Sequence, residues 1–393
     1  MQTTRGDSPN YLIIAGEASG DLHGSKLVSA LKARLPKAHF TGMGGTRMQK
    51  AGVDTLFGIE RMGAVGIVEV LGDFDHYYKV YRTLMREIAS LRYDAVILID
   101  YPTLNLRLAK QGKRLDCPVF YFISPQVWAW RKGRIRDIRN SVKKMFVILP
   151  FEEKIYLDAG VDAEFLGHPF VDLVHTSRTR EKSREKYSLN PKIKTIGLVP
   201  GSRMNEVNSL LDVMVQAAKK IQSKLGSCQF LLPVADSIDP DLLRQRLGAN
   251  PLRIQLIEGE PYDVMNSCDM LIIASGSATL EAGILGCPMV IIYKLNLLTY
   301  ILAKLLVNTP LVGLVNIVAE EEVVPELIQG QVTAENICTE VLAVMQAPEK
   351  EKAVRERLLK IKSTLGEPEV MKGLATRITD IMDKLRSNEK NPI

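Results

Sequence analysis

Ile196-Gly197-Leu198-Val199-Pro200-Gly201-Ser202-Arg203-Met204-Asn205-Glu206 is an apolar run that stops at Pro-Gly and continues into a helical pattern. This order predicts a buried strand, a tight turn and a helix. The first N–H groups of a helix lack partners and the helix dipole is positive there, so the turn can bind an anion such as phosphate beside the guanidinium of Arg203. An ordinary strand-to-helix connection with a solvated arginine explains the same residues equally well.

A second stretch repeats the order of strand, turn and helix. The apolar run 268–274 is followed by Ser275-Gly276-Ser277-Ala278-Thr279-Leu280-Glu281. Its amides and hydroxyls can bind a second phosphate oxygen, and Glu281 can accept hydrogen bonds from the hydroxyls of a ribose. Alternatively, Ser275 or Ser277 only caps the helix and Glu281 only favours its positive end. Two such turns in one domain favour a nucleotide site.

Short apolar runs bounded by Gly, Pro or Asp alternate with helical stretches along most of the chain. Strands that are apolar throughout and alternate with helices indicate a parallel sheet with helices on both faces. A polar segment with prolines, 167–192, interrupts the alternation and has the composition of a linker. The predicted strands are 11–15, 38–41, 95–99, 118–122 and 145–149 before this segment, and 193–199, 229–232, 253–256, 270–274 and 288–292 after it.

The pattern predicts an α/β protein with two Rossmann-like, doubly wound domains that face each other across a cleft, where ligands of such folds bind. The length of 393 residues also favours two domains. The expected parts are an N-terminal domain, 1–172, a C-terminal domain, 173–365, and a last helical segment, 366–393. This last segment is expected to pack back on the N-terminal domain or to be exchanged in a homodimer.

The composition argues against a membrane-spanning, secreted or metal-binding protein. No run reaches the ~18 apolar residues of a membrane span, because Lys294 and Lys304 interrupt the most apolar region. The N-terminus begins polar and lacks the order of a secretory signal, so a cytosolic protein is expected. Five single cysteines without a CxxC pair and five scattered histidines predict buried thiols and no metal site.

Carboxylates follow two of the predicted strands. Asp100 ends the strand 95–99, where a carboxylate can take a proton from a hydroxyl or cap the helix that begins near Thr103. On the first turn, Gly16-Glu17-Ala18-Ser19-Gly20-Asp21, Glu17 and Ser19 can contact a polar ligand, or Ser19 or Asp21 can cap the next helix. The turn is not the GxGxxG of dinucleotide binders, because Gly16 and Gly20 are too far apart.

Three apolar stretches suggest a lipid partner. Val65, Ile67, Val68 and Leu71 lie in the first, Ser124-Pro125-Gln126-Val127-Trp128-Ala129-Trp130 is the second, and 297–307 is the third. The second runs directly into the segment 131–144, of which half is basic. Aromatic, aliphatic and basic residues together suit the surface of an anionic bilayer. Core packing and a solvated helix face explain the same residues, and both interpretations stay open.

These motifs together closely resemble the lipid-A-disaccharide synthases, a family of peripheral-membrane glycosyltransferases with the GT-B fold. The matching residues are 16–21, 123–130, 166–169, 200–203 with Glu206, 275–281 and 314–316. The resemblance implies that UDP-2,3-diacylglucosamine is joined to 2,3-diacylglucosamine 1-phosphate, with inversion and without a cofactor, to give a disaccharide and UDP. It also implies a location on the cytoplasmic face of the inner membrane.

The resemblance also assigns roles to individual residues. The C-terminal half would bind the UDP donor and the N-terminal half the lipid acceptor, with Asp100 as the base, Arg203 as an essential arginine and Asn316 as a further functional residue. The candidate catalytic residues are Asp100, Arg203 and Glu17. The candidate donor-binding residues are Gly201, Ser202, Arg203, Glu206, Ser275, Gly276, Ser277, Ala278, Thr279, Glu281 and Asn316. The candidate acceptor- and lipid-binding residues are Gly16, Ser19, Val65, Ile67, Val68, Leu71, Ser124, Gln126 and Trp128.

Other functions remain to be separated from this one. A UDP-sugar 2-epimerase has the same two-domain fold, and it would release a free sugar from a UDP-sugar without an acceptor. A peripheral lipid-binding protein would not bind UDP. Nucleic-acid binding is disfavoured, because no known motif accompanies the basic segment.

Overall fold

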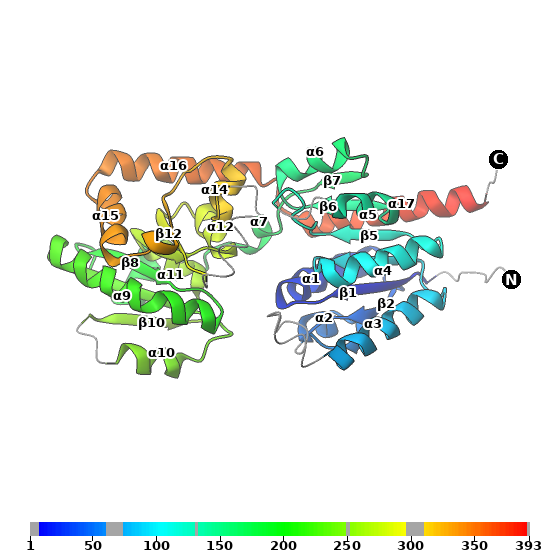
Figure 1. The fold of residues 1–393 in the computed structure, drawn as a ribbon, viewed down its shortest axis with the longest axis horizontal. Helices are drawn as coiled ribbons and strands as arrows, with labels where there is room; N and C mark the ends of the chain where they lie inside the picture. Colours follow the sequence, from blue (N-terminus) through cyan, green and yellow to red (C-terminus); the bar gives the residue numbers. More distant parts are fainter. Residues whose placement is uncertain (1–7, 60–73, 130–132, 249–251, 296–309, 391–393) are drawn as a thin grey trace. The chain divides into compact units, whose positions relative to one another are not determined.

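The computed structural model describes residues 8–59, 74–129, 133–248, 252–295 and 310–390. The chain forms two compact units, one of residues 1–169 with 366–393 and one of residues 170–365. Each unit contains one sheet with helices packed on it (Figure 1). The predicted fold class, α/β with two doubly wound domains, is confirmed.

The first unit is built on a seven-stranded sheet with the order β3-β2-β1-β4-β5-β6-β7. Its neighbouring strands are parallel. The strands are β1 (Asn10–Ala15), β2 (His39–Met43), β3 (Asp54–Phe57), β4 (Ala95–Ile99), β5 (Val119–Phe122), β6 (Lys144–Val147) and β7 (Ala163–Phe165). The helices are α1 (Ala18–Arg34), α2 (Thr46–Lys50), α3 (Phe74–Ala89), α4 (Pro102–Arg114), α5 (Arg134–Ser141), α6 (Pro150–Asp158) and α17 (Val370–Lys390).

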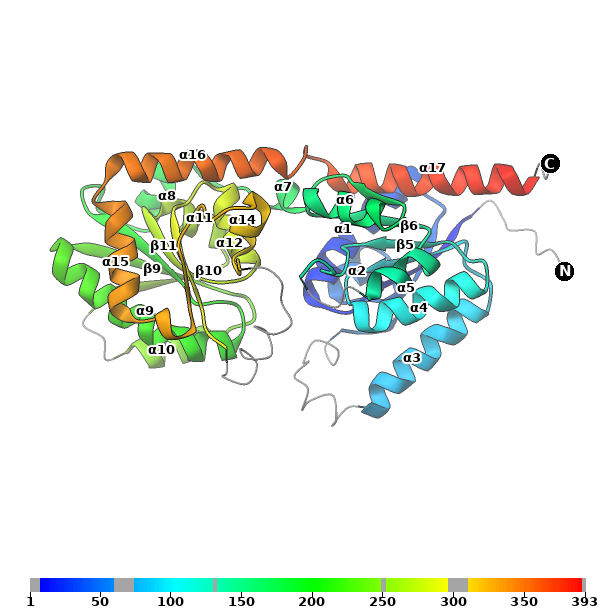
Figure 2. The same cartoon turned by 45° about the horizontal axis from the view of Figure 1, so that its top comes forward.

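Successive side chains of β1 enter two different cores, one on each face of the sheet. Leu12 and Ile14 belong to the core that includes the apolar sides of α3, α4 and α5. These three helices lie side by side on that face (Figure 2). Tyr11 and Ile13 belong to the opposite core, which α1 and α17 cover. Burial on both faces explains why the central strands are apolar at every position.

Helix α17 ends the chain and packs beside α1 in the first unit. Its residue Leu374 is fully buried in the same core as β1. Arg386 of α17 lies 3.2 Å from the buried carboxylate of Asp94, measured from Nη2 to Oδ1. Arg377 lies 2.7 Å from Glu164 of β7, measured from Nε to Oε1. Apolar burial and ion pairs therefore both hold this helix on the first sheet.

The second unit is built on a six-stranded parallel sheet with the order β10-β9-β8-β11-β12-β13. The strands are β8 (Lys194–Val199), β9 (Cys228–Val234), β10 (Ile254–Glu258), β11 (Met270–Ala274), β12 (Met289–Tyr293) and β13 (Glu326–Ile328). The helices are α7 (Phe170–Leu173), α8 (Arg180–Lys186), α9 (Met204–Leu225), α10 (Pro240–Leu247), α11 (Pro261–Ser267), α12 (Ser277–Ile284), α14 (Leu314–Ala319), the 3-10 turn η1 (Gln329–Gln331), α15 (Ala334–Met345) and α16 (Pro348–Thr364).

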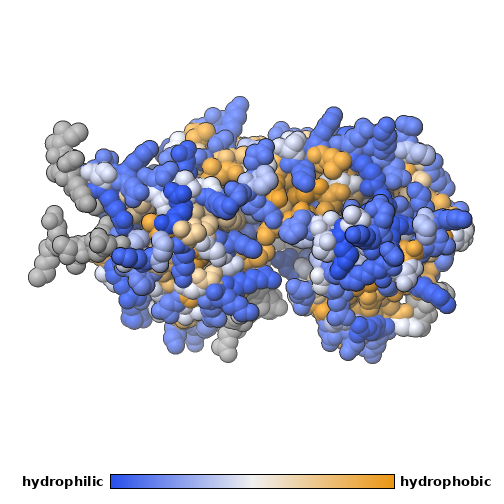
Figure 3. Space-filling view, turned by 180° about the vertical axis from the view of Figure 1, so that it is seen from behind, coloured by the Kyte–Doolittle hydropathy of each residue, from blue (hydrophilic) through white to orange (hydrophobic). Residues whose placement is uncertain are grey.

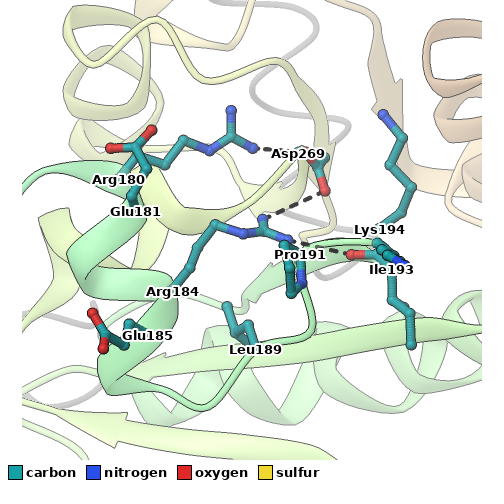
Figure 4. Close-up of a pocket in the computed structure, with 10 residues that line it drawn as sticks. Arg180, Glu181, Arg184, Glu185, Leu189, Pro191, Ile193, Lys194 and Asp269 are labelled. Carbon is teal, nitrogen blue, oxygen red and sulfur yellow. Dashed lines mark hydrogen bonds and ion pairs between the residues drawn. The ribbon is translucent and has the colours of Figure 1, made fainter.

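The polar segment after residue 170 is more ordered than its linker-like composition predicts, because α8 is fixed to the second sheet. Arg180 lies 2.6 Å from the carboxylate of Asp269, and Arg184 lies 3.7 Å from its other oxygen. These side chains line a cavity of about 640 Å³ (Figure 4). Lys194 at the start of β8 also lines the cavity, so the cavity lies at the amino end of the strands.

The surface and the cysteines complete the description. Hydrophilic residues cover most of the face seen in Figure 3, with hydrophobic residues in patches between them. The five cysteines are free thiols, and all but the half-buried Cys228 are buried, as predicted. Among the described residues, no helix has the length and apolar character needed to cross a bilayer.

Candidate active site

The predicted site residues of the first unit lie where its strand order reverses. Strand β1 continues to β2 on one side of the sheet, whereas its other neighbour, β4, continues to β5 on the opposite side. Ala15 pairs with Ile99 at the ends of these strands, so the turn after β1 and Asp100 after β4 are neighbours. Open parallel sheets bind ligands at such a switch point, beyond the carboxyl ends of the strands.

Asp100 and Tyr101 both have a left-handed backbone, with φ of 47° and 48°. This region is unfavourable for residues with a side chain, and such strain is concentrated at functional sites. Gly16 lies against the ring of Tyr101, and a Cβ on this glycine would lie 2.4 Å from Tyr101 Cγ. A glycine is therefore required at position 16 to make room for the strained turn.

The carboxyl of Asp100 has the electrostatics of a base that works near neutral pH. Burial and, to a smaller extent, the nearby charge of Glu17 raise its pKa from 3.8 to about 6, although the hydrogen bond from the N–H of Tyr101 acts in the opposite direction. A carboxyl with this pKa is ionised at pH 7 and is more basic than an exposed aspartate. The side chain of Asp100 is partly accessible, so a substrate hydroxyl can reach it.

The structure shows where the polar residues of the first turn lie. Glu17 is half-exposed and Ser19 is exposed, so both can contact a ligand. The side chain of Asp21 does not cap its own helix but accepts three N–H bonds from the start of α2: Gly45 N at 2.8 Å, Arg47 N at 3.1 Å and Met48 N at 2.9 Å. Asp21 therefore joins two helices, a role that its position in the sequence did not indicate.

The tryptophan motif follows β5 at the same edge of the sheet. Ser124 is buried and Gln126 is exposed. The indole N–H of Trp128 donates to Glu152 Oε1 at 3.0 Å, and the ring packs edge-on against Phe151 at 5.2 Å between centroids. Trp128 is thus fixed to α6 and is only partly available to a lipid.

Glu152 is a functional candidate that the sequence did not reveal. It is 1% exposed, and burial raises its pKa to about 7. Its second oxygen accepts from Leu149 N at 3.3 Å, as in a capping box. A Glu in the first turn of a helix is common at exposed positions, so nothing in the sequence marked this one as buried.

In the second unit, Gly201, Ser202 and Arg203 follow β8, and Ser275 and Gly276 follow β11. These two strands are paired, and the strand order reverses between them. The second unit therefore places its two predicted turns at its own switch point, at the carboxyl ends of adjacent strands.

The first of these turns differs from the expectation that its amides are free for a phosphate. Glu206 Oε2 accepts from Ser202 N at 3.0 Å and from Arg203 N at 3.3 Å. Gly201 has φ of 111°, and a Cβ there would lie 2.2 Å from the same Glu206 oxygen. Glu206 is thus an internal anion for these amides, because a carboxylate is favoured at a helix N-terminus. In this conformation Glu206 caps the helix, and its place among the donor-binding residues stays a prediction.

The guanidinium of Arg203 remains accessible. The side chain is 76% exposed, and Glu206 contacts it only at 3.2 Å through Oε1. An exposed pair of this kind contributes little to stability. The arginine can therefore turn toward a phosphate at small cost.

The second turn is more open than the first. Gly276 and Ser277 are exposed, and a Cβ on Gly276 would meet no atom within 4 Å. Thr279, in contrast, is buried and donates its hydroxyl to Gly276 O at 2.8 Å, so it stabilises the turn. Burial raises the pKa of Glu281, and a hydrogen bond from Ser277 opposes this.

Asn316, a predicted donor-binding residue, makes its hydrogen bonds within its own unit. It is fully buried, and its Oδ1 accepts from Val323 N at 2.9 Å and Val324 N at 3.1 Å. Its Nδ2 donates to Val324 O and to Glu326 Oε1, both at 2.8 Å. In this conformation Asn316 therefore stabilises the loop around α14 from within. Glu326, which the sequence analysis did not single out, is its charged partner.

Some predicted features lie outside the described residues. These are Val65, Ile67, Val68, Leu71, Trp130 and the whole apolar stretch 297–307. In the parts of the chain that are described, no three His, Cys, Asp or Glu side chains cluster in a way that could hold a metal ion.

Comparison with known sequences identifies one family over nearly the whole chain. The family model described as lipid-A-disaccharide synthetase matches residues 11–376. A lipid-A-disaccharide synthase from Syntrophus aciditrophicus is 44% identical over 363 residues, which are 92% of this chain and 95% of the relative. One from Geobacter metallireducens is 41% identical over 97% of this chain and 100% of its own length.

Comparison with solved structures supports the fold alone, because the sequence identities are low. A putative UDP-N-acetylglucosamine 2-epimerase from Listeria monocytogenes has a TM-score of 0.64 at 12% identity, covering 96% of this chain and 97% of its own. A glycosyltransferase from Rickettsia africae has a TM-score of 0.56 at 13% identity, covering 98% and 100%.

Proposed function

The chain belongs to the lipid-A-disaccharide synthase family and is a glycosyltransferase, and from this premise we propose its reaction in detail. The acceptor is 2,3-diacylglucosamine 1-phosphate, and the donor is UDP-2,3-diacylglucosamine. The 6-hydroxyl oxygen of the acceptor attacks the anomeric carbon of the donor, and the bond from that carbon to the UDP oxygen breaks. The products are a β-1′,6-linked disaccharide 1-phosphate and UDP.

The first unit supplies the base in this proposal. Asp100 takes the proton of the 6-hydroxyl as the new bond forms, which makes the oxygen a better nucleophile. Its pKa of about 6 supports this role, because the carboxyl is ionised at neutral pH yet retains basicity. Burial and, to a smaller extent, the charge of Glu17 keep the pKa of Asp100 high, and we propose that Glu17 also orients the acceptor. Ser19 and Gln126 are exposed candidate acceptor residues in the described part of this unit.

The second unit binds UDP and stabilises the negative charge that grows on it. Arg203 is exposed and carries a fixed positive charge. The open N-terminus of α12 at Ser277 adds unpaired N–H groups. The N-terminus of α9 contributes less than the sequence suggested, because Glu206 accepts from two N–H groups of its turn. Transfer is proposed to need no metal, so chelation with EDTA should leave the rate unchanged.

The observation that carries this proposal is the pairing of the family match with Asp100 at a strained switch point. The test is incubation of the purified chain with radiolabelled diacylglucosamine 1-phosphate and UDP-diacylglucosamine. A labelled tetraacyl disaccharide is the expected product. Release of free sugar from UDP-N-acetylglucosamine without acceptor would instead identify an epimerase. Absence of UDP binding by calorimetry would identify a lipid-binding protein.

We further propose that the first unit contacts an anionic membrane surface from the cytoplasmic side. The adjacent helices α3, α4 and α5 expose many more cations than anions, which suits anionic head groups. These cations are Lys79, Arg82, Arg86, Arg107, Lys110, Lys113, Arg114, Arg136 and Arg139. Co-sedimentation with phosphatidylglycerol vesicles, but not with phosphatidylcholine vesicles, is the expected result. A homodimer stays a prediction, to be measured by light scattering.

A further inference from the structure

We propose that Asn105 and Tyr121 are positioning residues that hold the carboxyl of Asp100 in its reactive orientation. The proposal rests on the proposed role of Asp100 as the base. Both side chains are fully buried, and both donate a hydrogen bond to the main-chain oxygen of Asp100 itself. Neither residue was singled out by its place in the sequence.

The contacts converge on one carbonyl from two elements. Tyr121 of β5 donates its hydroxyl to Asp100 O at 2.6 Å, and Asn105 of α4 donates Nδ2 to the same oxygen at 2.7 Å. Asn105 Nδ2 also lies 3.2 Å from Ile99 O, the last carbonyl of β4. Two donors on one carbonyl fix the plane of the peptide that joins Asp100 to Tyr101.

The peptide that joins Asp100 to Tyr101 lies between two residues with an unfavourable backbone conformation, so its orientation needs support from neighbouring side chains. Asp100 and Tyr101 are consecutive residues with side chains in the left-handed region, which crowds Cβ against the backbone. Rotation of this peptide would change ψ of Asp100 and φ of Tyr101, so it would relieve the crowding at Tyr101 and alter the backbone from which the Asp100 side chain projects. The two buried donors oppose this rotation, because a buried donor left without an acceptor is unfavourable.

Tyr121 is also suited to remain a donor. Its pKa is raised well above the usual value, first by burial and then by the charge of Asp100, so the phenol stays protonated. The charge of Glu17 affects the pKa of Asp100. The pKa of Tyr121 is affected by Asp100, Tyr156 and Arg134. The hydrogen bond from Tyr121 therefore persists throughout the pH range in which Asp100 titrates.

The test compares Tyr121→Phe with Tyr93→Phe. Tyr93 is a matched control, because it is buried in the same unit and donates its hydroxyl to Glu87 Oε2 at 2.7 Å, but it lies at the amino end of β4 and not at the Asp100 end. Both variants should lose a similar amount of thermal stability. In Tyr121→Phe we expect kcat to fall about tenfold with unchanged KM for both substrates, as for a misplaced base. The acid limb of its pH profile should also shift, whereas that of Tyr93→Phe should not.

Asn105→Asp gives a second measurement, because it keeps the shape of the side chain and removes the donating NH2 group. It should lower kcat in the same way as Tyr121→Phe. Equal kcat and an equal acid limb in both variants and the wild type, with the fold intact, would overturn the proposal. If the variants have a lower melting temperature but an unchanged kcat, the two residues have only a structural role, and the proposal is overturned as well.

Combination with Asp100→Asn separates this inference from the proposed function. If Tyr121 acts through Asp100, then Tyr121→Phe should cause no further loss of rate in the Asp100→Asn background. A further tenfold loss there would contradict the inference. If Asp100→Asn alone retains normal turnover, the role of Asp100 as base is wrong. If it abolishes turnover while Tyr121→Phe and Asn105→Asp behave as wild type, only the positioning role is wrong.

Discussion

The two units have switch points of the same topology and opposite chemistry. In the first unit, Glu17 and Asp100 place two carboxylates beyond β1 and β4, on a backbone that is left-handed at Asp100. In the second unit, Arg203 and the open turn at Gly276 lie beyond β8 and β11. The fold thus determines where each site lies, and the residues on the turns determine what it can do.

The difference also concerns how each site is held. The acidic turn is packed against Tyr101, Asn105 and Tyr121, which are buried. The basic turn is exposed, and among the described residues the side chain of its arginine is paired with Glu206 at 3.2 Å. A base must be placed within a few tenths of an ångström, whereas a long arginine can adjust to a phosphate. The rigid half is therefore expected to respond to small changes more strongly than the adaptable half.

The largest effect should come from the acidic switch point. Asp100→Asn keeps the shape of the side chain and removes its ability to accept a proton. We expect kcat to fall by roughly 10²–10⁴-fold, the usual contribution of general base catalysis. Initial rates with saturating donor and acceptor measure this. Asp116→Asn is a matched control, because Asp116 is exposed in the same unit and is also left-handed, with φ of 51°. Normal turnover of Asp100→Asn with an intact fold would exclude it as the base.

The basic switch point gives the second prediction. In the proposed mechanism the charge of Arg203 stabilises the negative charge that grows on UDP, so Arg203→Ala should lower kcat by roughly 10²-fold or more. Lys219→Ala removes another exposed cation of the same helix and should leave the rate unchanged. The loss in kcat should greatly exceed any change in acceptor KM. An equal loss of both would contradict the role assigned to Arg203.

The sequence predicted most of the fold, and the gaps have a common cause. The central strands, such as β1 and β4, are apolar at every position because both faces are covered, so they were found directly. The three strands that were missed, β3, β7 and β13, all lie at a sheet edge and are three or four residues long. Their half-exposed residues carry no continuous apolar signal.

The positions of the candidate turns were predictable, but the contacts of their side chains were not. Turns with Gly, Ser and Asp follow buried strands and lie at the carboxyl ends of both sheets, as the sequence predicts. The partner of each side chain was not predictable, because it depends on distant contacts. Glu206 neutralises its own turn, Asn316 bonds within its loop, and Tyr121 lies 21 residues beyond the carbonyl it holds. Local pattern contains no information about such pairs.

A third prediction concerns pH and the acidic half, in which Glu152 is buried beside Trp128. Burial raises the pKa of Glu152 from 4.5 to about 7. Because the folded pKa lies above the unfolded one, its contribution to stability is full below pH ~4.5 and is lost as pH rises toward ~7. The free energy of unfolding lost over this range is roughly 3 kcal/mol at most, obtained by converting the pKa shift into free energy. Asp100 contributes in the same sense between its ordinary value of 3.8 and about 6.

Glu152→Gln tests this prediction. The amide oxygen can still accept from Trp128, but the variant no longer titrates. As pH rises from 5 to 8, the melting temperature of the wild type should therefore decrease relative to that of the variant. Glu153→Gln is the control, because Glu153 is only partly buried and adjacent in sequence. A wild type and a Glu152→Gln variant with parallel pH profiles would show that Glu152 is ionised in the fold throughout.

The smallest effect compares one glycine from each switch point. A methyl group on Gly16 would lie 2.4 Å from the Tyr101 ring, whereas one on Gly276 would meet nothing within 4 Å. Gly16→Ala should therefore lower the free energy of unfolding by about 1–3 kcal/mol, as for overpacking, and Gly276→Ala should change it by less than about 0.5 kcal/mol. Urea denaturation without substrates measures both. Equal values would show that the acidic turn is as free to adjust as the basic one, and the contrast between a rigid half and an adaptable half would be lost.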